Sequence, residues 1–357
     1  MTLPPHAPDL SASLSADRWG ARWAEAGVQL FFADDEMRAV FGLRPDAVAA
    51  LASQLTQAVC AHEAVTGTLW SEAGPALGPV TDSRLHNADT LAAHPVAGRL
   101  YRLVRNLPLT GFEQSFKMLA GQLWSERFLV GLSTTAIAPE DVIFLASDLG
   151  MPPDLLHVFQ AGLADATFVH AGFEQGDHQC TYKLYLEFAP GTGGDAPGRP
   201  LYVGYKWNPE NAAQQAISRY TRPAALDLDD MLVRVTAVYG GTGDVHEVCR
   251  IAHQIIRMGA SRTNARALLF VEVREDGTPR LSFDINLYET GLRVRDLAPL
   301  LAEAATHFAA DSAAFSGLMA LTGEDFAGHL SGGRDRSGRP FLTLYHARPA
   351  SRPDRAD

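Results

Sequence analysis

The sequence predicts an α+β fold of repeated α-β-β-α units, with an antiparallel, barrel-like sheet surrounded by helices. Three pairs of β-rich segments are each joined by a short turn that contains Gly or Asp, the residues that a tight reversal needs. Helical patterns of ten or more residues lie between successive hairpins. The hairpins pair 168–175 with 181–188, 268–274 with 281–288, and 329–334 with 341–346.

Composition and charge narrow the class of protein. The 357 residues are 46% hydrophobic and 20% charged, as in globular proteins, which excludes a disordered or collagen-like chain. The net charge of −11 disfavours nucleic acid and anionic membranes as partners. Three scattered cysteines without a Cys-x-x-Cys pair favour a reducing compartment. The cytoplasm is the expected location, because no apolar run approaches the roughly 20 residues of a membrane span and no signal-peptide pattern opens the chain.

The first third of the chain differs in character from the rest. Residues 1–125 are predicted to form a mainly helical region, because apolar residues recur there at helical spacing. Residues 126–350 carry the hairpins and are expected to be continuous with the first region in one domain, and 351–357 are expected to be a disordered tail. Strands are predicted at 127–133, 166–175, 180–188, 200–207, 267–274, 280–288, 328–334 and 340–346. Helices are predicted at 139–149, 152–163, 209–219, 226–239, 244–258 and 295–309.

The polar faces of the predicted strands have an unusual composition. Side chains alternate across a strand, so 181–188 has one apolar face and one face that carries Lys183, Tyr185 and Glu187. Only three of the 30 Lys and Arg residues are lysines, and two of them, Lys183 and Lys206, lie in mid-strand on such faces. Scarce lysines, tyrosines and carboxylates together favour the inside of a barrel or deep cleft that surrounds a ligand. A one-sided sheet with a solvated outer face is the alternative.

Two of the hairpins resemble those of a known enzyme family. Phe168-Val-His-Ala-Gly-Phe-Glu174 with Thr181-Tyr-Lys-Leu-Tyr-Leu-Glu-Phe188 resembles a hairpin of the ABBA-type aromatic prenyltransferases, including the indole and cyanobactin-peptide members. His329-Leu-Ser-Gly-Gly-Arg334 with Pro340-Phe-Leu-Thr-Leu-Tyr345 is similar to that family's closing hairpin. From about residue 127 onward, the resemblance implies a ten-stranded barrel with helices outside. The sequence departs from this pattern in showing eight strand segments, and no early strand with the acidic residue that the family places beside the acceptor.

The resemblance also implies a reaction, the transfer of an allylic group from its diphosphate to an aromatic amino acid, a peptide or another aromatic acceptor. This chemistry needs cations for the diphosphate, rings that shield the allylic cation from water, and a carboxylate that takes a proton or orients the acceptor. The diphosphate candidates are Lys183, Lys206, Arg127 and Arg339; the aromatic candidates are Tyr185, Tyr202, Tyr288 and Tyr345; the carboxylate candidates are Glu187, Asp284 and Glu174.

A metal-independent reaction without a cofactor is expected. Metal-dependent isoprenoid chemistry needs an Asp-Asp-x-x-Asp cluster that bridges Mg²⁺ to the diphosphate. Neither the acidic group at 34–36 nor the one at 227–230 has that spacing.

Two other function classes stay open. The first is a non-catalytic binding or accessory protein that holds a small molecule or peptide in the same cavity. For the single residues, structural ion pairs are the alternative explanation of the lysines, and ordinary sheet packing is that of the tyrosines. The second class is a metal-dependent enzyme, because His246, Cys249 and His253 share one face of the predicted helix 244–258. That face also holds Ile256, so a core-facing helix with hydrogen-bonded histidines is the simpler explanation.

Overall fold

The chain separates into two compact units, 1–63 and 64–357. The computed structural model describes three strand backbones of the first unit and, in the second, residues 85–86, 88–176, 179–188, 200–223, 226–240, 245–263 and 265–348. The three strands, β1 (Trp19–Ala24), β2 (Gly27–Phe32) and β3 (Arg38–Phe41), form an antiparallel sheet in the order β1-β2-β3. Residues 27–41 had been expected within a helical region, so this part of the prediction is wrong.

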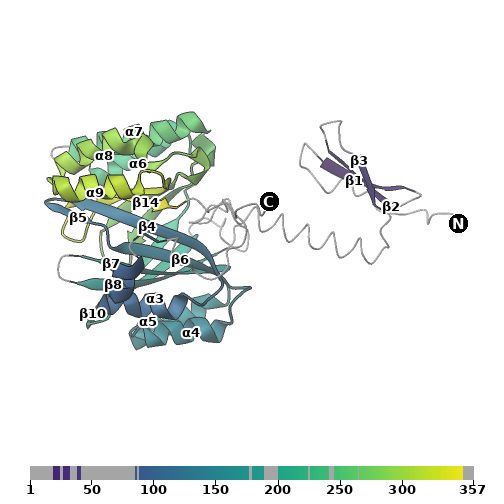
Figure 1. The fold of residues 1–357 in the computed structure, drawn as a ribbon, viewed down its shortest axis with the longest axis horizontal. Coiled ribbons are helices and arrows are strands. Elements are labelled where there is room, and N and C mark those ends of the chain that lie inside the picture. The colour runs from purple at the N-terminus through teal and green to yellow at the C-terminus, as the bar shows by residue number, and fades with distance from the viewer. Residues whose placement is uncertain are drawn as a thin grey trace. The chain divides into compact units, whose positions relative to one another are not determined.

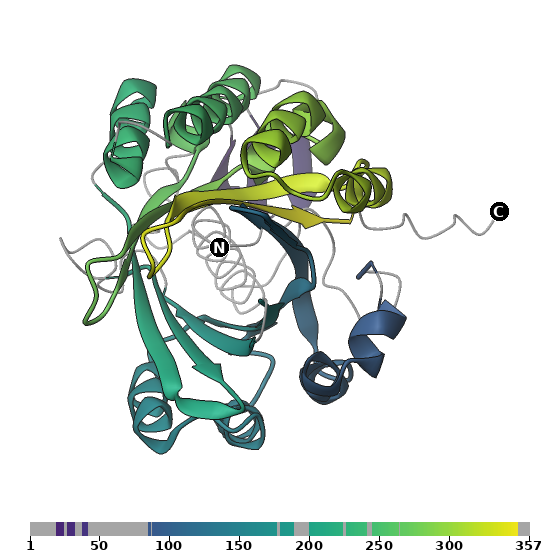
Figure 2. The ribbon, with the colours of Figure 1, turned by 90° about the vertical axis from the view of Figure 1, so that its left-hand side faces the viewer.

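Ten antiparallel strands of the second unit close into a barrel, which Figure 2 shows end-on. The order is β14-β13-β12-β11-β10-β9-β8-β7-β6-β4, and pairing of β14 with β4 completes the ring. A short strand, β5 (Gln122–Trp124), adds to β4. The barrel strands are β4 (Leu109–Leu119), β6 (Arg127–Ser133), β7 (Phe168–Gln175), β8 (Cys180–Glu187), β9 (Tyr202–Asn208), β10 (Asn211–Thr221), β11 (Phe270–Glu275), β12 (Leu281–Asn286), β13 (Phe326–Arg334) and β14 (Pro340–Ala347).

Helices surround the barrel on its outer side (Figures 1 and 2). Several begin where the sequence marks a start: α4 and α5 have proline in the first turn, and Asp227 caps α6 by accepting a hydrogen bond from the Asp230 amide. No described helix is long and apolar enough to cross a membrane. The helices are α2 (Ala88–Ala93), α3 (Pro95–Val104), α4 (Pro139–Asp148), α5 (Pro153–Leu163), α6 (Leu228–Tyr239), α7 (His246–Arg262), α8 (Val294–His307) and α9 (Ser312–Thr322), with short 3₁₀ turns at Ala265–Ala267 and Tyr288–Thr290.

Two apolar layers join the helices to the barrel wall. One packs α2 to α5 against β6 to β9, and the other packs α6 to α9 against β11 to β14. Leu184 and Leu186 of β8 are fully buried in the first layer, as strand alternation predicted. The apolar faces thus point outward to the helices, which leaves the polar faces to line the inside of the barrel.

The predicted fold class, an antiparallel barrel of α-β-β-α units surrounded by helices, is confirmed. All eight predicted strands and all three hairpins are present, with ends shifted by at most a few residues. The prediction of a helix at 209–219 is wrong, because this segment is β10, and 109–119, expected within a helical region, is β4. These two strands raise the count from eight to ten. The predicted tail at 351–357 lies outside the described residues.

Replacing Gly332 of β13 by alanine is expected to destabilise the barrel by about 2–4 kcal/mol. A Cβ at this position would collide with the Tyr239 hydroxyl and lie 2.9 Å from the Phe283 ring, and Tyr239 would lose its 2.9 Å hydrogen bond to the Phe341 carbonyl. Urea unfolding measures the effect. The matched control is Gly317→Ala on exposed α9, where a Cβ meets nothing within 4 Å and stability should stay equal or rise by up to about 1 kcal/mol. Equal stability of both variants would contradict the prediction.

Candidate functional site

The barrel encloses a polar cavity of about 370 Å³. Its lining comes from the inward faces of the strands and from the turns that follow β11 and β13, including Arg280, Arg336 and Arg339. A second space of about 490 Å³ forms the outer part of the same opening, because it shares seven lining residues with the cavity: Trp124, Glu174, Gln179, Thr181, Asn208, Gln214 and Arg339. Described residues of the cavity lining comprise seven cationic side chains, Lys117, Arg127, Lys183, Lys206, Arg280, Arg336 and Arg339, and four acidic ones, Glu174, Glu275, Asp284 and Asp335.

Glu174 of β7 organises the first group of cations. Arg127 Nη1 lies 2.8 Å from its carboxylate oxygen Oε2, and Lys183 Nζ forms an ion pair with the same oxygen. Arg127 Nε also donates a 3.0 Å hydrogen bond to the Ser115 hydroxyl. Burial acts to raise the pKa of Glu174, but Arg127, Lys183 and Lys117 outweigh it and hold that pKa well below its usual range. Glu174 therefore stays ionised and positions the cations, which makes it a poor proton acceptor.

Two lysines of this group have a lowered pKa, so each holds its proton only weakly near neutral pH. Burial, together with repulsion from Arg127, lowers the pKa of Lys117 to about 7. Burial likewise lowers the pKa of Lys183 to about 8, although Glu174 opposes the shift. The Lys117 ammonium also lies 4.2 Å from the centre of the Phe341 ring and 5.4 Å from that of Trp124, within cation–π range. An anion in the cavity would favour the charged form of both lysines.

A second group of cations lies beside the first, next to it in the β8–β9 ladder. Lys206 is the register partner of Lys183, and it makes no ion pair with the described residues. Burial and then repulsion by Arg280 and Lys183 lower the pKa of Lys206 well below its usual value. Buried Glu275 forms ion pairs with Arg280, at 3.1 Å, and Arg336.

The predicted diphosphate residues all line one cavity. Lys183, Lys206 and Arg127 project from the strands, whereas Arg339 lies at the opening and donates to Asp335 at 2.9 Å. Their convergence requires the closed barrel, because they come from β6, β8, β9 and the turn before β14.

The predicted aromatic residues divide into two sets. Tyr185 and Tyr345 line the cavity, together with Tyr220, which packs edge-on against Tyr185 with ring centres 5.8 Å apart. Tyr202 is buried in an apolar cluster with Leu129 and Val271, outside the cavity lining. Tyr288 lies in a 3₁₀ turn after β12 and donates a 2.8 Å hydrogen bond to Glu113. The prediction that Tyr288 ends a strand is therefore wrong, since the strand stops at Asn286.

Two predicted carboxylates are each bound to a histidine. Glu187 lies 2.7 Å from His170 Nε2, and it is not part of the described cavity lining. Burial raises the pKa of Glu187 well above its usual value and lowers that of His170 to about 3, so this pair holds one proton between neutral partners. Asp284 does line the cavity, and its oxygen lies 2.7 Å from His329 Nδ1.

Sequence reasoning missed Glu113, which β4 places on the inside of the barrel. Glu113 is 1% exposed and lines a small extension of the cavity with Arg127, Lys183, Tyr185 and Tyr345. Its Oε1 accepts from Tyr288, whereas its buried Oε2 has no hydrogen-bond partner among the described residues. Burial raises the pKa of Glu113 to about 8. A buried carboxylate with a free oxygen and a pKa near neutrality is suited to accept a proton. The alternation at 112–118 is the signal that could have found it.

The helical His/Cys/His group does not form a metal site. His246 is exposed, whereas His253 Nε2 lies 3.0 Å from the Leu232 carbonyl and 3.2 Å from the Thr236 hydroxyl. Cys249 Sγ is 3.6 Å from the same His253 nitrogen. These three are not among the described side chains whose ligand atoms converge. The core-facing explanation of this helix fits Cys249 and His253 but not the exposed His246.

No protein-family model matches the chain, and no curated protein matches its sequence. Among solved structures, AnaPT from Neosartorya fischeri is 14% identical, with a TM-score of 0.42 over 66% of this chain and 78% of that one. NotF prenyltransferase is 9% identical, with a TM-score of 0.46 over 66% of this chain and 80% of its own. The closed ten-stranded antiparallel barrel with outer helices is the fold that the resemblance of the two hairpins implies.

Proposed function

We propose that this protein transfers an allylic group from its diphosphate to an aromatic amino acid, an aromatic peptide or another aromatic acceptor, without a metal. The observation that carries the proposal is the excess of basic over acidic side chains in the barrel cavity of an acidic protein. Seven cationic and four acidic side chains line it, whereas the whole chain has a net charge of −11. An allylic diphosphate carries about three negative charges and complements this excess.

The cations would act on the leaving group. Lys183, Lys206, Arg127 and Arg339, with Lys117 and Arg280 beside them, surround one space, so negative charge that develops on the diphosphate is stabilised as the allylic C–O bond breaks. Ion pairs position four of these six groups before the reaction: Glu174 holds Arg127 and Lys183, Glu275 holds Arg280, and Asp335 holds Arg339. Charges that are already in position stabilise such a transition state without reorganising.

The rings and the free carboxylate would act on the other half of the reaction. Tyr185, Tyr220 and Tyr345 present π-faces and exclude water from the allylic cation. The cation forms a C–C bond with a ring carbon of the acceptor, and that carbon then loses its proton. Glu113 Oε2 is free to accept this proton, and Asp284 is a second acidic group on the lining.

Mass spectrometry tests the proposal directly. The protein is incubated with dimethylallyl diphosphate and a panel of aromatic amino acids and peptides, and a product heavier by one C₅H₈ unit is expected. Binding of the diphosphate without any product would instead support the non-catalytic binding protein. Absence of both product and binding would contradict the proposal.

Replacing Lys206 by methionine is expected to weaken diphosphate binding about 10- to 100-fold, because it removes an amine that no described carboxylate pairs with and that a bound anion favours in its charged form. Isothermal titration with dimethylallyl diphosphate measures the change. Arg219→Ala is the matched control, since Arg219 on the neighbouring β10 forms an exposed ion pair with Asp276 at 2.9 Å. Unchanged affinity in Lys206→Met, with the fold intact, would remove Lys206 from the site.

Diphosphate affinity is expected to fall as the pH rises from about 6.5 to about 9. The empty cavity holds the pKa of Lys117 at about 7 and that of Lys183 at about 8, and a bound anion raises both. Binding then takes up protons at neutral pH, so affinity drops by up to about tenfold per pH unit for each proton. Titration calorimetry in buffers of different ionisation enthalpy measures the uptake. Constant affinity over this range, with no proton uptake, would contradict the assignment.

Replacing Glu113 by glutamine is expected to lower the turnover rate about 10²- to 10⁴-fold, because an amide cannot take the ring proton. Diphosphate affinity should change little. In the unmodified protein, the rate should rise with pH as Glu113 ionises near its pKa of about 8. Single-turnover kinetics separate this rise from the loss of affinity. A full rate in Glu113→Gln would exclude this carboxylate as the proton acceptor.

A further inference from the structure

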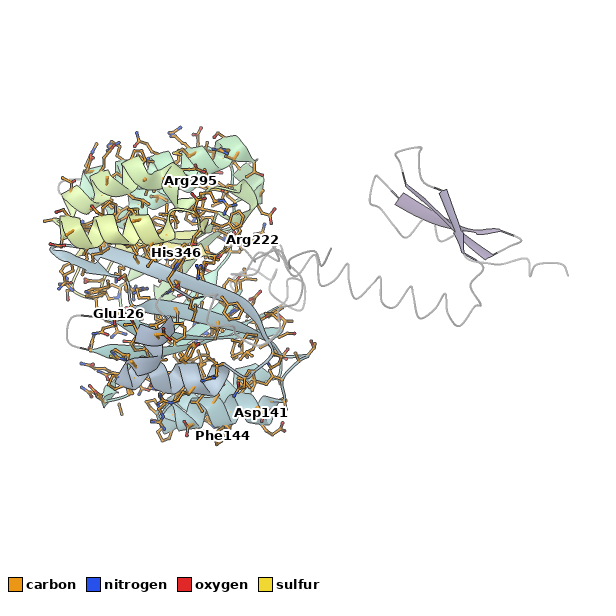
Figure 3. The ribbon with its side chains drawn as sticks, in the orientation of Figure 1. Glu126, Asp141, Phe144, Arg222, Arg295 and His346 are labelled. Carbon is orange, nitrogen blue, oxygen red and sulfur yellow. The ribbon has the colours of Figure 1, made fainter. Side chains whose placement is uncertain are left out.

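Three buried side chains from distant parts of the chain meet outside the barrel wall. They are His86 before α2, Asp325 before β13, and His346 of β14, and they are exposed by 7%, 3% and 3%. Tyr345 lines the cavity, so its neighbour His346 points to the outer side of the strand, where it contacts Phe116. Figure 3 labels His346 close to α9 in this view. This group, the His86–Asp325–His346 cluster, takes no part in the site described above.

The donor atoms of the cluster converge on one point. His86 Nε2 lies 2.8 Å and His346 Nδ1 lies 2.7 Å from the same carboxylate oxygen, Asp325 Oδ2. The three atoms all lie within 4.8 Å of one another, and no other group of His, Cys, Asp or Glu among the described residues converges in this way. Two imidazole nitrogens and one carboxylate oxygen are a ligand set of Zn²⁺ and of other divalent first-row metals.

Hydrogen bonds of the backbone hold the cluster in place. The His86 amide donates to Gln114 Oε1 at 2.6 Å, and Gln114 Nε2 donates back to the His86 carbonyl at 3.1 Å. Gln114 is also the register partner of His346 in the β4–β14 ladder. The Asp325 amide donates to the Thr322 carbonyl at 2.9 Å. The three ligands are therefore positioned by the fold, which lowers the cost of ordering them around an ion.

We propose that the His86–Asp325–His346 cluster binds one divalent transition-metal ion, with Zn²⁺ as the representative ion, and that water completes the coordination. The metal bonds form at His86 Nε2, His346 Nδ1 and Asp325 Oδ2. The proton on each of these nitrogens moves to the other nitrogen of its ring. The two contacts to Asp325 must widen by roughly half an ångström to reach the spacing of metal ligands. The ion ties the segment before α2 to β13 and β14, so its role is structural.

The test uses the full chain, purified without a histidine tag and stripped with a chelator. Titration with Zn²⁺ should give one tightly bound equivalent by elemental analysis, and Co²⁺ should give a visible d–d absorption band. Zn²⁺ at about 100 times its Kd should raise the melting temperature by roughly 5 °C. Binding of dimethylallyl diphosphate should survive removal of the metal, because the cluster lies outside the cavity.

Matched variants assign the metal to the cluster. Asp325→Asn and His346→Asn should each lower Zn²⁺ affinity by at least about 100-fold, more than loss of an outer hydrogen-bonding partner usually costs. His157→Ala on α5, an exposed histidine, should keep full affinity. Unmodified protein that shows no bound equivalent, no Co²⁺ band and no thermal shift overturns the proposal, whether or not the variants fold. Full affinity in both cluster variants also overturns it.

Discussion

The pairing of β4 with β14 is the constraint on which the barrel and its cavity depend. Register pairs run from Gln114 with His346 to Leu119 with Phe341, and they make the first barrel strand the neighbour of the last. Every barrel strand then has two partners and no free edge, and the inward-facing side chains surround one cavity. Lys117 and Thr343 lie opposite each other in this ladder, and both line the cavity.

Closure also sets the electrostatics of the cavity. In open water the lysines would hold their protons firmly, whereas burial and mutual repulsion lower the pKa of Lys117, Lys183 and Lys206. Glu174 and Glu275 offset part of this cost through their ion pairs, but cations remain in excess. The empty cavity therefore carries unfavourable charge repulsion that an anion relieves on binding. The negative charge of the whole chain has no bearing on this local preference.

The sequence predicted the strands whose two faces differ most. In β8 the alternation of leucines with Lys183 and Tyr185 was readable without any structure, and the predicted diphosphate residues line the cavity on the expected face. In β10 the Ala- and Gln-rich start favours a helix locally, but pairing with β9 and β11 decides its conformation. Propensity cannot report such long-range pairing.

Two site residues were missed because their strand was missed, and one named residue was assigned the wrong conformation because of a local turn. Lys117 and Glu113 lie on β4, a segment expected within a helical region, although the alternation at 112–118 already places both side chains on one face of a strand. Tyr288 departs from the predicted strand because the Asn286 side chain accepts a hydrogen bond from the Tyr288 amide at 2.9 Å, which bends the chain into a 3₁₀ turn. The hydrophobic pattern of 281–288 contains no sign of this bend.

Closure of the barrel joins segments more than 200 residues apart, from β4 at Leu109–Leu119 to β14 at Pro340–Ala347. Such long-range pairing forms its contacts only after the loop-closure entropy has been lost. We therefore expect the β4–β14 contacts to form together, as one cooperative step from an open to a closed barrel. The His86–Asp325–His346 cluster spans this seam, since Gln114 of β4 holds His86 and pairs with His346. The cations of the cavity likewise converge only in the closed barrel. A metal ion outside the barrel wall and a diphosphate inside it would therefore both bind the closed barrel. By mass action, each ligand would stabilise the closed barrel independently of the other.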